Sequence, residues 1–523
     1  MYDYIIVGAG SAGCVLANRL SEDPDTRILL LEAGPPDEAR AIHIPAAYAQ
    51  TFKTKLDWNY TTAPQGHLNG REIYYPRGKT LGGTSSINAQ IYMRGHRSDY
   101  DRWASLGNRG WSYDEVLPFF KKSENNERGP SAYHGSGGPL NVTDLRDPNP
   151  LTRAFVRAGV EIGISHNYDF NGPKQEGIGI CQVTQKDGRR CSTAVGYLHP
   201  VMQRFNLKVI TSAHVIQILL KDRRAVGVEY LKNGQKQTVR AKREVLLSGG
   251  VINSPQLLML SGIGPAEHLK SLGINVVHDL PGVGENLQDH IGLPLLFRSK
   301  KPVSLLAAKS IKSRLAYLLL KKGMFTSNLT EGCAFVRTKS DIFAPDLQLH
   351  FLAVLSSDYG LDQPTEHGFT VVPTLLQSNS VGNILLRSSN PLDPPLIQPN
   401  YLSNRVDEDL RILTEGIKLS RHIVKAKAFQ QYADGEMEPG AHVQSKEDIE
   451  AYVRKKVQTI YHHVGTCKMG VDEMAVVDPE LRVRGIEGLR VVDASVMPVI
   501  VRGNTNAPII MIAEKAASLI KGE

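Results

Sequence analysis

The N-terminal pattern alternates short apolar runs with one glycine-rich segment. Residues 4–7 are apolar and favour a β-strand, and the glycine-rich residues 8–13 follow at once. Apolar side chains recur at helical spacing over residues 15–20, and a second apolar run at residues 27–31 ends in Glu32. The pattern predicts a strand, a tight turn, a helix and a second strand that ends in an acid.

More elements are predicted further along the chain. The Asn233-Gly234 dipeptide indicates a hairpin turn. Helices are expected over residues 254–260, opened by Pro255, and over residues 508–519. The apolar stretch 315–320 is too short to span a membrane and predicts a core or entrance helix, with a membrane-touching patch as the lesser alternative. Apolar, β-favouring runs occupy residues 207–211, 225–230, 244–248, 346–351 and 489–493.

Each part of the N-terminal unit suits a dinucleotide. Gly8 permits the tight turn, Gly10 lets the backbone approach a pyrophosphate, and Gly13 allows close packing of helix and strand. The phosphates would meet free N–H groups at the helix N-terminus. Glu32 would accept hydrogen bonds from the adenosine ribose, and an acid there disfavours NADP because it repels a 2′-phosphate. The motif alone leaves NAD and FAD open.

A second glycine-rich segment covers residues 76–95 and contains many hydroxyl side chains. It predicts either a phosphate cradle made of backbone N–H groups or a mobile loop. Pieces of the nucleotide fold stand apart, at residues 1–34, 240–265 and 488–520. A sheet built from both chain ends forces the intervening segments to form a second domain, and the cleft between the two domains suits a substrate.

Composition excludes several classes of protein. The 523 residues are 41% hydrophobic and 22% charged, which is typical of a folded globular protein. The net charge of +8 is mild for this length and includes no run of five like charges, so no nucleic-acid partner is expected. Neither a transmembrane nor a secretory segment is expected. The expected location is the cytoplasm, with peripheral contact to the inner membrane left open.

The cysteines are odd in number, scattered and without a C-x-x-C pair. No metal site is therefore expected, and a reduced, intracellular setting is the default. Each is expected to be a small buried apolar side chain. They are Cys14, Cys181, Cys191, Cys333 and Cys467.

Together with the N-terminal unit, four further segments resemble the motifs of the glucose–methanol–choline (GMC) oxidoreductases, in the family's order and over residues 1 to about 520. The branch that they resemble most holds bacterial FAD-dependent alcohol, sorbose, polyethylene-glycol and choline dehydrogenases. The four segments are 77–88 (RGKTLGGTSSIN), 248–258 (SGGVINSPQLL), 461–470 (YHHVGTCKMG) and 503–508 (GNTNAP).

The resemblance implies an α/β fold in which a Rossmann-like FAD-binding domain is interleaved with an α+β substrate domain carrying an antiparallel sheet. The first domain would comprise residues 1–155, 200–295 and 456–523, and the second residues 156–199 and 296–455. FAD would be bound non-covalently, because Ile87 stands where some relatives have the histidine that bonds to FAD, and an aliphatic side chain cannot do so.

The resemblance also assigns residues. His462 would be the catalytic base, since a neutral imidazole suits proton abstraction near neutral pH, and Asn504 would hold the substrate oxygen. Hydride would pass from the carbon to flavin N5. Residues expected to bind the cofactor are Gly8, Gly10, Ser11, Ala12, Gly13, Glu32, Ala33, Gly82, Gly83, Thr84, Asn88, Ala89, Ile91, Val215, Tyr461, Asp493, Ala494, Thr505 and Asn506.

The expected reaction is oxidation of a primary aliphatic alcohol or polyol to an aldehyde or ketone. Alternatives are a choline-type dehydrogenase, an oxygen-using alcohol oxidase, a flavoprotein with lyase or decarboxylase activity, and a non-catalytic FAD-binding protein. The electron acceptor stays open among oxygen, a quinone and a carrier protein.

Three residues have no settled role in the sequence. His463 is expected to pack rather than face the pocket. Arg502 either tunes substrate charge or lies on the surface. Glu331 would bind a cationic head group or, as the favoured interpretation, be solvated or salt-bridged.

Overall fold

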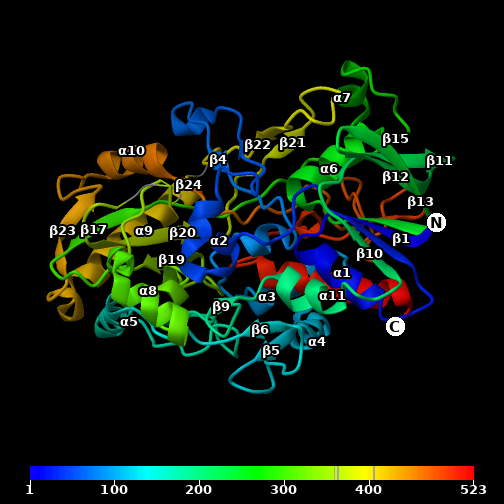
Figure 1. Ribbon diagram of the computed structural model, residues 1–523. Coiled ribbons are helices and arrows are strands. Elements are labelled where there is room, and N and C mark those ends of the chain that lie inside the picture. The colour runs from blue at the N-terminus through cyan, green and yellow to red at the C-terminus, as the bar shows by residue number, and fades with distance from the viewer. Residues whose placement is uncertain (359, 362–363, 405–406) are drawn as a thin grey trace.

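The computed structural model describes residues 1–358, 360–361, 364–404 and 407–523. Two β-sheets organise these residues, one toward each end of the elongated view in Figure 1. One sheet is mostly parallel and the other is antiparallel. The predicted α/β fold class, with a Rossmann-like sheet beside an antiparallel one, is confirmed.

The first sheet is built from both ends of the chain. Its parallel part has the order β10-β2-β1-β13, and β25 pairs in parallel with β13. An antiparallel extension, β11-β12, continues from β13. The strands are β1 (Tyr2–Val7), β2 (Ile28–Leu31), β10 (Leu207–Ile210), β11 (His214–Lys221), β12 (Arg224–Lys232), β13 (Gln235–Leu247) and β25 (Leu489–Val491). Every strand predicted in this part of the sequence is present.

Two helices from opposite chain ends pack together beside this sheet. α1 (Ser11–Leu20) lies next to α11 (Asn506–Lys521), and Arg19 of α1 donates to the fully buried Glu514 of α11 at 2.8 Å. Figure 1 shows both termini on this side of the molecule. The contact brings the glycine-rich turn before α1 close to the N-terminus of α11.

The second sheet is antiparallel throughout its main path, β23-β17-β20-β19-β18-β7, with β16 and β24 attached. The helices α5 (Pro150–Glu161) and α9 (Glu408–Lys425) pack against it and against each other. Its strands are β7 (Gly177–Ile180), β16 (Ile291–Gly292), β17 (Leu295–Ser299), β18 (Thr330–Val336), β19 (Leu347–Leu352), β20 (Gly368–Leu375), β23 (Ala433–Glu438) and β24 (Gln458–Thr459). The exact division of the chain into the two predicted domains stays a prediction.

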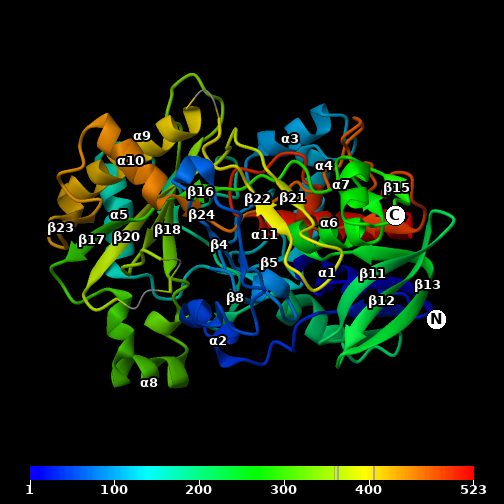
Figure 2. The same cartoon turned by 90° about the horizontal axis from the view of Figure 1, so that it is seen from above.

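The other α-helices are distributed around the two sheets (Figures 1 and 2). They are α2 (Arg40–His43), α3 (Arg97–Ser105), α4 (Tyr113–Ser123), α6 (Gly250–Leu260), α7 (Ala266–Ser271), α8 (Ile311–Leu320) and α10 (Lys446–Lys456).

The predicted hairpin is present, but the predicted helix start at Pro255 is wrong. Asn233 and Gly234 both have positive φ, as the two central residues of a type I′ hairpin turn require. α6 begins at Gly250, so Pro255 lies inside the helix. A proline leaves the carbonyl four residues earlier without its usual donor. Here the Thr466 hydroxyl donates to that carbonyl of Val251 at 2.6 Å, which explains how the helix accommodates the proline.

Two other expectations are corrected in part. Residues 315–320 belong to α8, whose leucines are exposed, so the core-helix interpretation is wrong, whereas the entrance-helix interpretation fits Arg314 of α8, which lines the large cavity described below. Cys181 and Cys333 are joined as a disulfide next to the β7–β18 pairing. They are therefore not independent thiols, although both are buried as expected. The pairing of β7 with β18 brings the two cysteines together. Their spacing in the sequence does not reveal this proximity.

Candidate active site

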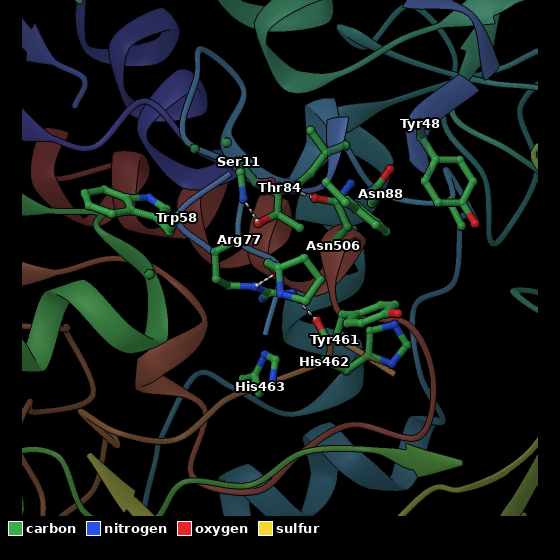
Figure 3. Close-up of a pocket in the computed structure, with 18 of the residues that line it drawn as sticks. Ser11, Tyr48, Trp58, Arg77, Thr84, Asn88, Tyr461, His462, His463 and Asn506 are labelled. Carbon is green, nitrogen blue, oxygen red and sulfur yellow. Dashed lines mark hydrogen bonds between the residues drawn. The ribbon is translucent and has the colours of Figure 1, made fainter. Parts of the chain in front are cut away.

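A cavity of about 810 Å³ runs from the first sheet to the second. At one end it is lined by the turn between β1 and α1, and at the other by His462 and strands of the antiparallel sheet. Figure 3 shows Ser11, Thr84 and Asn506 gathered on one side of this cavity and the Tyr461–His463 segment on another. The cavity therefore joins the predicted cofactor site to the predicted catalytic site.

The glycines of the first turn are needed for different structural reasons. A Cβ on Gly13 would lie 1.9 Å from the Gly8 carbonyl oxygen, and a Cβ on Gly8 would lie 2.5 Å from the Ser248 carbonyl oxygen. A Cβ on Gly10 would meet no protein atom within 4 Å, and Gly10 lines the cavity. Gly8 and Gly13 allow the fold itself, whereas the open space above Gly10 fits a ligand such as a pyrophosphate.

Glu32 ends β2 as predicted and is tied into the same turn. Its carboxylate accepts the backbone N–H groups of Ala9 and Gly34, each at 2.8 Å. Burial raises the pKa of Glu32 to about 7, against these hydrogen bonds, which lower it. Across the cavity, the Ser11 hydroxyl donates to the Asn506 side chain at 2.7 Å, joining the N-termini of α1 and α11. Two helix N-termini thus converge where phosphates would lie.

The second glycine-rich segment is an ordered part of the cavity wall rather than a separate loop. The Gly82 N–H donates to the Ala9 carbonyl at 2.7 Å, and a Cβ on Gly83 would lie 2.8 Å from the Gly10 Cα. Thr84 lies in the same short helical turn and lines the cavity. Of the two interpretations left open by the sequence, the cradle fits this arrangement.

The structure brings nearly all the predicted site residues to one cavity. Gly13 and Gly82 lie behind its wall and shape the turns. The predicted residues that line it are Gly8, Gly10, Ser11, Ala12, Glu32, Ala33, Gly83, Thr84, Asn88, Ala89, Ile91, Val215, Tyr461, His462, Asp493, Ala494, Asn504, Thr505 and Asn506.

A chain of hydrogen bonds fixes the tautomer of His462. His290 Nε2 lies 2.9 Å from the Leu376 carbonyl oxygen, which can only accept, so this nitrogen carries the proton. Nδ1 of neutral His290 is then an acceptor, and His462 Nδ1, 3.0 Å away, donates to it. His462 Nε2 is left with a lone pair, toward which the Asn504 amide nitrogen points at 3.0 Å. His462 is thereby prepared to accept a proton at Nε2.

Burial keeps this chain neutral. It lowers the pKa of His290 to about 3, and it holds the pKa of His462 well below the ordinary value. Neighbouring histidines and the guanidinium of Arg77 push the pKa of His462 in the same direction. The carbonyl oxygen of the Asn504 side chain is buried and has no hydrogen-bond partner. A neutral base and an amide that keeps one unsatisfied oxygen therefore lie together beside the cavity.

The segment carrying His462 is held from behind by Asp289. This carboxylate accepts the His462 backbone N–H at 3.0 Å and the Thr459 hydroxyl at 2.6 Å. The Thr459 oxygen in turn accepts the Tyr461 N–H at 2.8 Å, and Arg77 donates to the Tyr461 carbonyl at 2.8 Å. Tyr461 has φ +70°, a conformation uncommon outside glycine. The network fixes the two peptide groups that precede the base.

His463 packs, as expected, although it also borders the cavity. Its ring is buried, its centroid lies 3.9 Å from that of Tyr75, and its Nε2 is 3.2 Å from the Thr459 hydroxyl.

The expectations for Arg502 and Glu331 are wrong. Arg502 is neither a cavity residue nor a free surface side chain, because it pairs with the buried Asp99 and donates to Gln377 at 2.7 Å. Glu331 is neither solvated nor salt-bridged. It is buried outside the cavity wall and accepts hydrogen bonds from the Thr152 and Ser327 hydroxyls, each at 2.6 Å.

Asp289 and His290 were not predicted from the sequence. They are adjacent ionisable residues directly before the apolar run 291–297, and both are buried. That contrast is a usable signal, because buried titratable groups gather at functional sites.

Comparison with known proteins decides the family. The N-terminal family model for GMC oxidoreductases matches residues 2–292, and the C-terminal model matches residues 378–513. The chain belongs to the GMC oxidoreductase family. It is an FAD-dependent oxidoreductase acting on CH–OH donors. The open space above Gly10 and the two converging helix N-termini fit the FAD that this family implies.

Individual relatives match over nearly the whole chain. An alcohol dehydrogenase [acceptor] from Pseudomonas putida is 49% identical over 99% of this chain and 96% of its own. Mitochondrial choline dehydrogenase from Homo sapiens is 47% identical over 100% of this chain and 90% of its own. The crystal structure of pyridoxine 4-oxidase from Mesorbium loti superposes with a TM-score of 0.92 at 32% identity, covering all of both chains.

The tautomer chain makes a prediction for His290. Replacing His290 by leucine removes the acceptor for His462 Nδ1–H, and we expect kcat to fall by about 10²-fold with FAD content unchanged. H290Q can accept from His462 and donate to Leu376, so it should retain more activity. Steady-state kinetics and flavin absorbance check both variants. Equal losses in the two variants would show that His290 only fills space.

Proposed function

We propose that this enzyme oxidises a neutral, predominantly apolar primary alcohol, or a polyol, to the corresponding carbonyl compound, with His462 as the base and Asn504 as the oxygen-binding group. The observation that carries the proposal is the pairing of His462 Nε2 with the Asn504 amide at 3.0 Å, at the border of the cavity. An alcohol hydroxyl that replaces this contact would accept from the Asn504 amide and donate to His462 Nε2, as proton removal requires.

The substrate half of the cavity supports a neutral, apolar substrate. Several apolar side chains line this part, and they come from the antiparallel sheet and from the chain between β17 and β18. Among the described residues lining the whole cavity, the only carboxylates are Glu32 and Asp493. Glu32 accepts from the Ala9 N–H of the first glycine-rich turn, and Asp493 accepts from the Gly250 N–H and the Ser254 hydroxyl. The apolar residues are Leu305, Leu306, Met324, Phe325, Leu329, Leu352, Val354, Leu355 and Val372.

The residues act in a fixed order. Asn504 holds the hydroxyl oxygen by its amide, and His462 Nε2 accepts the hydroxyl proton. The imidazolium that forms keeps its Nδ1–H on His290, whose other nitrogen is anchored at the Leu376 carbonyl. Bound FAD supplies the acceptor for the hydride that leaves the carbon. The apolar lining keeps water from the developing charge, which strengthens the polar contacts around it.

Choline is the second candidate because a choline dehydrogenase is among the relatives. Tyr48, Phe52 and Tyr461 form an aromatic wall in the cavity. The Phe52 ring centroid lies 5.9 Å from that of Tyr48 and 6.3 Å from that of Tyr461. Such rings can contact a quaternary ammonium. Glu331, the acid that the sequence offered for this role, lies outside the cavity wall. We therefore place the neutral alcohol first.

The substrate test is a kcat/KM series on the FAD-loaded enzyme with a dye acceptor. Primary alcohols of increasing chain length, a polyol and choline are compared, and peroxide is measured without dye to separate oxidase from dehydrogenase. The proposal predicts that kcat/KM rises with alkyl chain length and exceeds the value for choline. A value for choline above every primary alcohol overturns it.

We further propose that FAD is held without a covalent bond. Ile87 is buried, lines the cavity and offers no nucleophilic atom. Acid precipitation of the holoenzyme is therefore expected to leave a colourless pellet and a yellow supernatant. A yellow pellet after washing would contradict the proposal.

A further inference from the structure

The exposed face of α8 is apolar. Ile311, Leu315, Leu318 and Leu319 follow the i, i+4, i+7, i+8 spacing of one helix face, and they are between 50% and 77% exposed. Tyr317, on the opposite side, is buried and packs against Phe325. The helix is thus anchored by one side and presents leucines to the surroundings. Figure 2 shows it projecting from the molecule on the side of the antiparallel sheet.

Basic residues flank this face in the sequence. Residues 305–325, which include α8, contain five lysines and arginines and no aspartate or glutamate. Arg314 and Lys322 are exposed, and the Lys321 ammonium lies 4.7 Å from the Tyr317 ring centroid. The neighbouring β8–β9 turn (Gln185–Lys186, Arg189–Arg190) adds the exposed Lys186 and Arg189 and one acid, Asp187, which pairs with Arg146 at 3.2 Å. The whole chain has a net charge of only +8, so this concentration is local.

The helix also stands at the opening of the active-site cavity. Arg314 is exposed and at the same time lines the cavity, which places it where the cavity meets solvent. The segments on both sides of α8 line the cavity as well, through Leu305 and Leu306 before it and Phe325 after it. A surface or molecule bound to α8 would therefore cover the cavity opening or lie beside it.

We propose that α8 docks this enzyme on an anionic lipid bilayer, with its leucines in the acyl boundary and its basic residues at the headgroups. An apolar helix face with flanking lysines and arginines is the pattern that binds such surfaces. A second copy of the chain would bring the same basic rims against each other, which disfavours self-association. With 10 residues α8 is too short to span a bilayer, so the proposed contact is interfacial. Among the described residues, no helix qualifies as a membrane span.

Docking also gives an apolar alcohol a direct path from the bilayer to the cavity. This second part rests on the proposed function, whereas the docking itself does not.

The experiment is co-sedimentation of the holoenzyme with phosphatidylcholine vesicles, with and without 30% phosphatidylglycerol. We expect binding to the anionic vesicles only, weakened by salt. L318S/L319S should lower the partition coefficient at least about tenfold, and K321Q/K322Q should lower it and reduce the salt dependence. F205S is the matched control, because Phe205 is 87% exposed elsewhere on the surface, and it should bind like wild type.

Several outcomes overturn the docking. These are a wild type that does not bind anionic vesicles, equal binding of L318S/L319S and wild type, or a wild-type dimer that L318S/L319S dissociates without any vesicle binding. Oxidation of 1-butanol in the absence of vesicles serves as the separate measure of the active site. If wild type binds vesicles but oxidises no alcohol, the proposed function fails and the docking stands.

Discussion

Replacing His462 by alanine is expected to lower kcat by about 10²–10⁴-fold while FAD stays bound. The loss follows from the geometry, because Nε2 is the acceptor beside Asn504 and its lone pair is fixed through Nδ1. A methyl group in its place can neither accept the proton nor orient the amide. Steady-state kinetics, with FAD content measured by absorbance, give the result directly.

The control for this variant is His442→Ala, since His442 is exposed and outside the cavity wall. H442A should match wild type in both kcat and FAD content. Near-normal turnover in H462A would remove His462 from the mechanism. Loss of FAD from H462A would instead mean that the side chain supports the cofactor site. Measuring kcat and FAD content together distinguishes these results.

Replacing Gly10 by alanine is expected to weaken FAD binding at least about tenfold without lowering the Tm of the cofactor-free chain. Gly10 has φ −73°, which alanine adopts freely, and its Cβ would meet no protein atom within 4 Å. The only cost would come from a ligand that approaches the backbone. FAD titration and thermal unfolding of the apoprotein measure the two quantities.

Two further glycine substitutions serve as controls for this prediction. G66A also places its Cβ where nothing lies within 4 Å, but Gly66 does not line the cavity, so FAD binding should be unchanged. G13A would put its Cβ 1.9 Å from the Gly8 carbonyl oxygen and should destabilise the fold itself. Unchanged FAD binding in G10A would mean that the cofactor phosphates do not lie above this turn.

The sequence predicted best where local pattern and covalent neighbours decide the structure. The β1–α1–β2 unit and the Asn233-Gly234 turn depend on short-range spacing and on residues that tolerate positive φ. The start of α6 was misplaced because Thr466, remote in sequence, satisfies the carbonyl that Pro255 leaves free. Tertiary contacts of this kind override a local rule.

The site followed the same division. Motif resemblance placed His462 and Asn504 at one cavity border, where the structure brings them into contact. His290 belongs to no such motif, and its pairing with His462 arises only when β16 aligns with β24. Glu331 was misjudged for the same reason. One of its partners, Thr152, is remote in sequence, and the other, Ser327, lies in an irregular segment just before β18.

The most direct test of the central claim is a single turnover in the absence of oxygen. The FAD-loaded enzyme is mixed with excess 1-octanol and no acceptor, and flavin absorbance and aldehyde are measured together. The account predicts that the flavin absorbance bleaches with one aldehyde formed per FAD, and that H462A bleaches at least about 10²-fold more slowly. An intact, FAD-loaded wild type that no alcohol bleaches would contradict it.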